Sequence, residues 1–232
     1  MWASRVLPFV AFLMIALAPE AYAGLIPHML YGTRVAGQVI DAETGKPIEG
    51  AHVALLWRSG IVPRGFTGHN SRDICYHAAA TTTDAYGKFE IPAWKEWSTY
   101  DVVLVGPTVL IYKVGFRPIQ MLTQRESERG PVKHLDERYK LSPFTGSTKE
   151  RLDSLYFGLA NQGCDYGGLS QKTLYPMLKS IYNEARSIAQ APEETKSLWS
   201  FATQAAYAAL ALDPQGPARD NEVKAFISEN LK

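Results

Sequence analysis

The chain has 232 residues, 46% of them hydrophobic, and its 24 basic and 23 acidic residues leave a formal net charge of +1. That hydrophobic content is enough for a packed core and excludes general disorder. The near-neutral charge gives no electrostatic reason to expect nucleic acid as a partner.

The first 23 residues have the features of a secretory signal peptide. Arg5 precedes an apolar run from residue 6 to residue 18, and Ala21 and Ala23 have the A-x-A spacing of a cleavage site. The run is shorter than the roughly 20 residues that a membrane span needs. We therefore predict that residues 1–23 are removed and that the protein is periplasmic or secreted, with no stable membrane insertion after cleavage.

Residues 32–143 have the pattern of a series of short strands. The run TRVAGQVIDA alternates between two faces, with Val35 and Val39 on one and Ala36 and Gln38 on the other. Further runs follow between turn residues: AHVALLWR, CYHAAATTT, KFEIPAW, YDVVLVGPTVLIYKVGFRPI and VKHLDERYKL. Because no helical crossover separates these runs, the pattern predicts an antiparallel sandwich and not a parallel sheet.

Residues 147–232 have helical periodicity and predict three to four helices. Ser147 and Glu150 form a capping-box pattern before the first apolar stripe, and Pro176 lies in the first turn of the second or kinks it. Pro192 opens a third helix, and Val223 marks a short last one. These stripes need a surface to bury them, so the helices either form a small bundle or lie along one sheet. The predicted fold class is α+β in two parts.

Three segments of residues 32–143, two around turns and one at the end of a strand, match the sequence pattern of a known family. The segments GQVIDAETGKPIEGAHVAL, TTTDAYGKFEIPAW and LIYKVGFRP resemble the carboxypeptidase regulatory-like family, the transthyretin-like β-sandwich that follows many carboxypeptidase catalytic domains. The matching residues are Gly37, Val39, Asp41, Thr44, Gly45, Pro47, Ile48, Gly50, Ala51, Val53, Thr83, Asp84, Gly87, Phe89, Gly115 and Phe116. The resemblance implies an accessory and non-catalytic role, since members of that family hold no peptidase site of their own.

The matched residues also have structural roles that need no family. Asp41 and Thr44 can hydrogen-bond the turn backbone through their short side chains, and Gly45 supplies a positive φ. Asp84 and Gly87 bracket a second turn. We therefore expect these residues to form the framework and not a ligand site.

The exported chain contains two cysteines, Cys75 and Cys164. An even count in an oxidising compartment predicts a disulfide, which would join the strand region to the helical region. Closing so long a loop stabilises by about 4 kcal/mol on the chain-entropy model. The alternative is two separate thiols, one or both of them buried.

Two histidine-containing patterns are candidates for a catalytic or metal site. His134 and Glu137 have the H-x-x-E spacing of zinc carboxypeptidases, but no histidine follows His134 to act as the third ligand. The run GHNSRD brings His69, Ser71 and Asp73 together in sequence, whereas triads assemble from separate elements. We therefore predict no catalytic residue, no metal and no cofactor.

Aromatic residues cluster in YGKFEIPAWKEWSTYD, where Trp94, Trp97 and Tyr100 are expected in a loop between strands. Aromatic rings at the rim of a sandwich can stack on sugar rings or on apolar side chains of a partner. The alternative is that they close one end of the β core.

Three functions are compatible with these observations. The leading expectation is an exported, non-catalytic binding or scaffold protein of the bacterial cell envelope, with the helical part as an interface or cap. The second is a carbohydrate-binding module that uses Trp94, Trp97 and Tyr100. The third is a hydrolase with a site in the insertion at residues 59–74, which is longer than the family usually carries. The partner, an envelope protein or a glycan, is not specified by the sequence.

Overall fold

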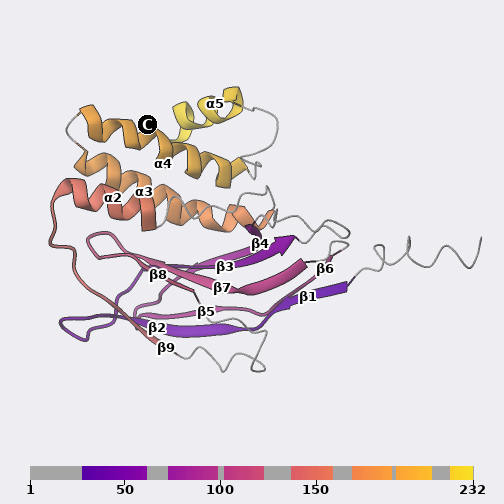
Figure 1. Ribbon diagram of the computed structural model, residues 1–232. Helices are drawn as coiled ribbons and strands as arrows, with labels where there is room; N and C mark the ends of the chain where they lie inside the picture. Colours follow the sequence, from indigo (N-terminus) through magenta and orange to yellow (C-terminus); the bar gives the residue numbers. More distant parts are fainter. Residues whose placement is uncertain are drawn as a thin grey trace, which may run out of the picture.

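A computed structural model of the protein describes residues 28–61, 73–98, 102–122, 137–158, 169–189, 192–210 and 220–231. The strands are β1 (His28–Gly32), β2 (Val35–Asp41), β3 (His52–Ile61), β4 (Asp73–Thr82), β5 (Lys88–Ile91), β6 (Trp94–Ser98), β7 (Val102–Tyr112), β8 (Ile119–Leu122) and β9 (Glu137–Leu141). The helices are α2 (Thr148–Gly158), the short 3-10 helix η2 (Leu169–Leu174), α3 (Tyr175–Ile188), α4 (Pro192–Leu210) and α5 (Asp220–Asn230). The described chain is therefore α+β with its helices after its strands, as the sequence predicts (Figure 1).

The strands form two sheets that face each other, together with a short ribbon. One sheet has the order β5-β2-β9, the other has the order β4-β3-β7-β8, and β1 pairs with β6 (Figure 1). The prediction that the strands are antiparallel is wrong for β9, which pairs parallel with β2 from Gly37↔Glu137 to Asp41↔Leu141. A parallel pair needs a long connection but not a helix. Here the chain reaches β9 from β8, a strand of the opposite sheet, so the absence of helical crossovers did not exclude parallel pairing.

The space between the two sheets is filled by side chains that point inward from alternate positions. From the β5-β2-β9 sheet these are Val35, Val39, Phe89, Ile91, Tyr139 and Leu141, and from the other sheet Val53, Leu55, Trp57, Val109 and Ile111. The alternation of buried and exposed residues on β5 follows from this arrangement, because its other face is open to solvent.

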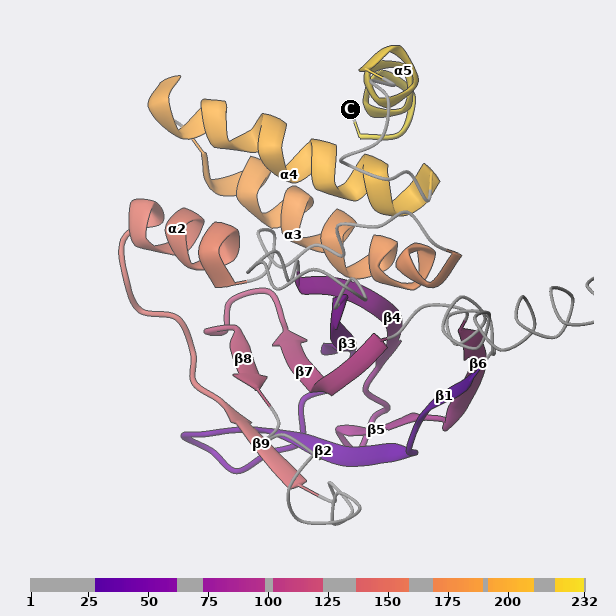
Figure 2. The same cartoon turned by 45° about the vertical axis from the view of Figure 1, so that its right-hand side comes forward.

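A second core lies between the four-stranded sheet and the helices. Its sheet residues are Ala54, Leu56, Ala78, Leu110 and Tyr112, and its helical residues include Leu155, Met177, Leu178, Ile181 and Phe201. Residues 53–57 of β3 and 109–112 of β7 are thus buried on both faces of the sheet, which explains why these two stretches are continuously apolar and do not alternate. The helices lie along one sheet: α2 and α3 contact it, α4 packs behind them, and α5 is outermost (Figure 2).

The starts of α2 and α3 have the features that the sequence predicts. The backbone N–H of Glu150 donates to Ser147 Oγ (3.3 Å) and the backbone N–H of Ser147 donates to Glu150 Oε2 (2.7 Å), so the capping box before α2 is confirmed. Pro176 lies in the first turn of α3, where a missing N–H costs little. None of the described helices is long and apolar enough to cross a membrane.

A buried ion pair joins two helices to the sheet. Arg151 of α2 and Glu184 of α3 are 4% and 9% exposed, and the guanidinium donates to both carboxylate oxygens, at 2.9 and 2.8 Å. Glu184 also accepts from the Tyr112 hydroxyl of β7 (2.7 Å) and from the backbone N–H of Gly115 (3.2 Å), and Arg151 donates to the Phe116 carbonyl. Because these buried groups satisfy one another, they hold α2 and α3 in one position on the sheet.

Candidate functional site

The turn after β2 uses the matched residues as framework. Asp41 Oδ1 accepts from the backbone N–H groups of Glu43 (2.7 Å) and Thr44 (3.1 Å). These bonds, with that to Glu43 the stronger influence, lower the pKa of Asp41 below its ordinary value. Gly45 follows with φ +68°. The Asp41 carboxylate is therefore used to close the turn.

The turn before β5 is built in the same way. Asp84 Oδ1 accepts from the backbone N–H groups of Tyr86 (2.9 Å) and Lys88 (2.8 Å). The buried Thr83 hydroxyl donates to the Ile48 carbonyl (2.6 Å) and accepts from the N–H of Ala51 (2.8 Å). The residues that carry the family resemblance thus bind one another, as their structural interpretation expects.

The aromatic residues predicted to contact a ligand do not act as one group. Trp94 and Trp97 lie on β6, a strand in place of the expected loop, where Trp94 is opposite Gly32 of β1 and Trp97 is opposite Met29. Residues three apart on a strand point to opposite faces. The two tryptophans are therefore on different sides of the β1–β6 ribbon, and Tyr100 lies outside the described residues.

Trp94 points toward the sheets and closes one end of the β core. Its ring stacks on His77 of β4, with centroids 4.1 Å apart, and Trp57 of β3 meets both rings edge-on at 5.4 and 5.3 Å. A Cβ atom added to Gly32 would overlap the Trp94 indole, so β1 passes directly against that ring. The ring contacts of Trp94 with His77 and Trp57 hold the ribbon on the body of the protein.

The opposite side of the ribbon is apolar and exposed. Met29, Tyr31 and Trp97 are 47%, 62% and 70% exposed, and we call this group the outer strip. Pairing places Met29 opposite Trp97 and Tyr31 opposite Lys95, so all these side chains share one face. Clustered exposed apolar residues of this kind are typical of an interaction surface.

His77, which lies below the ribbon, and His52 are expected to make the stability of the protein depend on pH. Burial lowers the pKa of His77, an effect that Glu96 (Oε1 3.6 Å from Nδ1) opposes, and burial followed by the Lys113 charge lowers the pKa of His52. The unfolded chain then binds protons more readily than the folded one. The stabilisation that these two neutral imidazoles contribute is complete above the ordinary histidine pKa of 6.5. It is lost as the pH falls from 6.5 toward the lower pKa values that His77 and His52 have in the folded protein.

We therefore expect the melting temperature to fall between about pH 7.5 and pH 5.5, and to fall less in His77→Phe. His52→Gln is the matched variant, because it removes the second imidazole and leaves the stack of His77 on Trp94 intact. An unchanged pH dependence in both variants would show that neither imidazole contributes.

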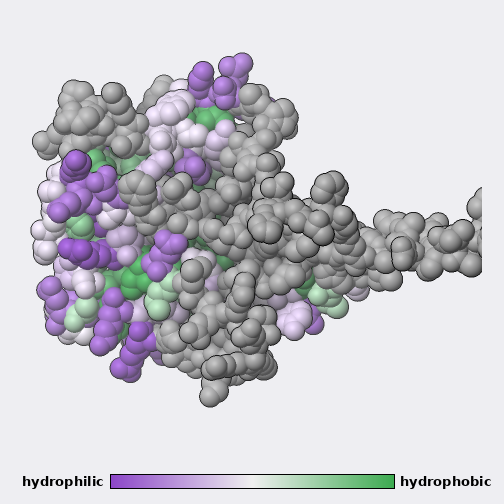
Figure 3. Space-filling model, viewed as in Figure 1, coloured by the Kyte–Doolittle hydropathy of each residue, from purple (hydrophilic) through white to green (hydrophobic). Residues whose placement is uncertain are grey.

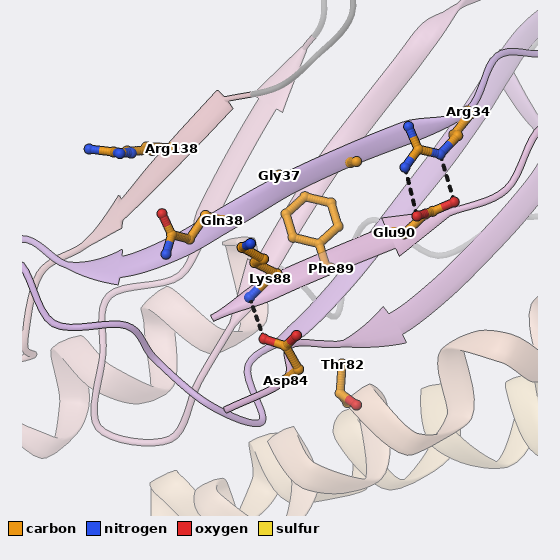
Figure 4. A pocket seen from close by; sticks show the side chains of 10 residues that line it. Arg34, Gly37, Gln38, Thr82, Asp84, Lys88, Phe89, Glu90 and Arg138 are labelled. Atoms are coloured by element: carbon orange, nitrogen blue, oxygen red, sulfur yellow. Dashed lines mark hydrogen bonds and ion pairs between the residues drawn. The ribbon is translucent and has the colours of Figure 1, made fainter. Parts of the chain in front are cut away.

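A shallow groove of about 570 Å³ lies on the outer face of the β5-β2-β9 sheet (Figure 4). Ala36, Gly37 and Gln38 of β2 form its floor, with Lys88 of β5 on one side and Arg138 of β9 on the other. The strand register places Gln38 opposite both Lys88 and Arg138. These three polar side chains therefore form one row across the sheet.

The two carboxylates that line the groove are already bound by neighbouring groups. Arg34 donates to both oxygens of Glu90, at 2.6 and 2.7 Å, and this hydrogen-bonded pairing lowers the pKa of Glu90 (Figure 4). Asp84 accepts the backbone bonds of its turn. Lys88 and Arg138 are exposed, and neither forms an ion pair with another residue of the described ranges. The groove therefore presents positive charge.

The remaining predicted residues lie mostly outside the described chain. Cys75 is on β4, opposite Arg58 of β3, but Cys164 is outside the described residues, so the disulfide stays a prediction. His134 also lies outside them. Within the parts of the chain that the structure describes, no three His, Cys, Asp or Glu side chains gather closely enough to hold a metal ion.

The insertion at residues 59–74 is described only at its two ends. Ser59 pairs with Ile74 and Gly60 with Asp73, so these ends extend the β3–β4 hairpin past an irregularity at Trp57. Residues 62–72, which include His69 and Ser71, lie outside the described ranges. The hydrolase alternative depends on that stretch and stays a prediction.

Comparison with known proteins gives weak likenesses only. No family model matches the chain, and no curated protein does. Solved structures that align include a 3-chlorocatechol 1,2-dioxygenase from Rhodococcus opacus 1CP (14% identity, TM-score 0.31, 48% of this chain and 60% of that one) and a streptococcal ancillary pilin (13%, 0.24, 49% and 30%). A 9R-lipoxygenase from Cyanothece PCC8801 aligns at 12% identity and a TM-score of 0.21, over 82% of this chain and 26% of that one. This chain thus spans less than two thirds of each, and TM-scores this low carry no argument about fold or activity.

Proposed function

We propose that the protein is an exported, non-catalytic binding protein of the bacterial cell envelope, built on a transthyretin-like sandwich of the carboxypeptidase regulatory-like kind. Support for the sandwich comes from the two facing sheets and from the turn hydrogen bonds of Asp41, Thr83 and Asp84. The observation that carries the binding role is the outer strip on the β1–β6 ribbon. The export step rests on the leader at residues 1–23.

The ribbon is suited to binding because its two sides have different roles. Trp94 and Leu30 are directed toward the body of the protein, where Trp94 stacks on His77 and Leu30 is buried. The outer strip is thereby held in place before any partner arrives. Binding through a pre-ordered surface avoids much of the entropy cost of fixing side chains. Exposed tryptophan and tyrosine are also the residues that most often dominate the energy of an interface.

The helices restrict where a partner can bind. They cover the face of the four-stranded sheet that points away from the other sheet, and they bury Leu56, Leu110 and Tyr112 there. Figure 1 shows the ribbon extending from the opposite end of the sheets from β9, clear of the helices. The helical part therefore acts as a cap, and the ribbon is the surface proposed to receive the partner.

We expect Trp97→Ala to weaken binding of an envelope partner about 30-fold, the effect of losing a residue worth roughly 2 kcal/mol. The partner is identified by mass spectrometry after co-purification with the mature protein from its native envelope, and the affinity is then measured with the purified pair. Trp199→Ala is the matched control, because that tryptophan is 51% exposed and lies on α4 instead of the ribbon. Equal binding by Trp97→Ala and the wild type, with loss in Trp199→Ala, would assign the interface to the helices instead.

Carbohydrate binding is a second candidate, favoured by one observation. Tyr31 and Trp97 occupy diagonal positions on the same face of the ribbon, which places such side chains about 7–8 Å apart. Two rings at that spacing can stack on a sugar chain. Binding on a glycan array that is lost in Trp97→Ala and in Tyr31→Ala, but kept in Trp199→Ala, would favour this candidate over a protein partner.

A further inference from the structure

The outer face of the β5-β2-β9 sheet carries more positive charge than the chain as a whole. The alternating burial of these strands directs the following residues outward: Ala36, Gln38 and Ile40 from β2, Lys88 and Glu90 from β5, and Arg138 and Lys140 from β9. Arg34 neutralises Glu90. Three cations then remain on one sheet face of a protein whose formal net charge is +1. In Figure 3 hydrophilic side chains gather over the lower left of the molecule, where β2 and β9 meet in Figure 1.

These cations are arranged in rows by the strand register. Lys88 and Arg138 are both opposite Gln38, so with neighbouring strands about 4.8 Å apart their backbones are roughly 10 Å apart, on either side of β2. Lys140 is opposite Ile40, two residues further along and about 7 Å from the first row. The row of Lys88, Gln38 and Arg138 together with Lys140 is called the basic track.

We propose that the basic track binds an extended acidic segment of a partner protein, which lies along β2 with alternate Asp or Glu side chains above the two rows. Alternate side chains of an extended peptide repeat at about 7 Å, the same spacing as the rows. Recognition of acidic motifs by clustered cations is a common mode of peptide binding. Charge complementarity is therefore the basis of the match.

The row also contains a group suited to the peptide backbone. Gln38 Nε2 donates to the Tyr86 carbonyl (2.9 Å), which orients the side-chain amide, and no residue of the described ranges donates to its oxygen. That oxygen can accept a backbone N–H from the bound segment. The outward residues of these three strands include no aromatic ring, which argues against a sugar on this face. The basic track is thus separate from the outer strip in position and in chemistry.

The test is fluorescence anisotropy with the mature chain and a labelled octapeptide of alternating Glu and Ser. We expect binding that weakens as salt is raised, and that weakens at least about tenfold in Lys88→Gln/Arg138→Gln. The matched control is Lys172→Gln/Lys224→Gln, because these lysines are exposed on η2 and α5 and their loss changes the net charge equally. Melting curves of both double variants check that the fold is retained.

Three outcomes would overturn the proposal: equal weakening in the control pair, equal binding of an octapeptide of alternating Gln and Ser, or tighter binding of an oligogalacturonate that depends on Lys88 and Arg138. The last would assign the face to an anionic sugar. Trp97→Ala is expected to leave binding of the acidic peptide unchanged. The proposal for the basic track and the proposed function of the outer strip can therefore fail independently of each other.

Discussion

Replacing Arg151 by methionine is expected to lower the free energy of unfolding by roughly 3–5 kcal/mol. Methionine preserves much of the side-chain volume but leaves the Glu184 carboxylate buried between α3 and β7 without its cation. The remaining partners of that carboxylate, the Tyr112 hydroxyl and the Gly115 N–H, are neutral donors and do not offset a buried charge. Urea denaturation followed by circular dichroism measures the loss.

The matched control is the double variant Arg151→Met/Glu184→Met, which removes both charges. We expect it to recover most of the lost stability, because an apolar pair of similar volume often replaces a buried ion pair at little cost. Part of the loss should persist, since Tyr112 and the Phe116 carbonyl lose a partner. A single variant within about 1 kcal/mol of the wild type would mean that water reaches Glu184.

Gly87→Ala is the second change with a large expected effect, at least about 2 kcal/mol. Gly87 has φ +69°, and an added Cβ would overlap the Val39 carbonyl oxygen and lie 3.1 Å from the Ile48 nitrogen. Val39 lies in β2 and Ile48 in the connection from β2 to β3, and both contacting atoms are backbone, so relief requires the backbone itself to move. Chemical denaturation of the purified variant measures the change.

Gly87→Ala combines backbone strain at a positive φ with a steric overlap, and Gly45→Ala separates these two causes. Gly45 has almost the same φ, +68°, but an added Cβ would meet nothing within 4 Å. We expect it to cost only the conformational part, about 1 kcal/mol. Equal losses in the two alanine variants would show that the Val39 contact does not contribute.

Most of the helices, turns and strands could be predicted from interactions between residues that are close in the sequence. The capping box at Ser147 and Glu150, the placement of Pro176 in a first turn, and the alternating pattern of β2 each depend on interactions within a few residues. The turns at Asp41 and Asp84 are of the same kind, so their hydrogen bonds could be anticipated from spacing alone. Local chemistry of this sort is visible in a single sequence.

Features that depend on contacts between residues far apart in the sequence could not be predicted. The sequence predicts a loop at Trp94 and Trp97, next to Pro92, whereas the strand form of β6 depends on pairing with β1. The parallel pairing of β9 depends on a connection between sheets. No periodicity marks Arg151 and Glu184 as partners, since they lie on different helices and are 33 residues apart in the sequence.

The candidate surfaces show the same division. The sequence drew attention to Trp97, and its exposure on the ribbon agrees with a contact role that stays a proposal. Trp94 could not be separated from it without knowing that both lie on one strand. The basic track was not predicted, because Lys88 and Arg138 come to lie in one row with Gln38 only after β5 and β9 have paired with β2.

The parallel pairing of β2 with β9 has a consequence for the folding pathway. Partners such as Gly37 and Glu137 are about a hundred residues apart, so we expect this contact to form late, because contacts between distant residues are slow to form. Until β9 arrives, one edge of β2 has open hydrogen-bonding groups that can recruit a second chain and start aggregation. Since β9 leads directly into α2, the same event also delivers the helices to their sheet.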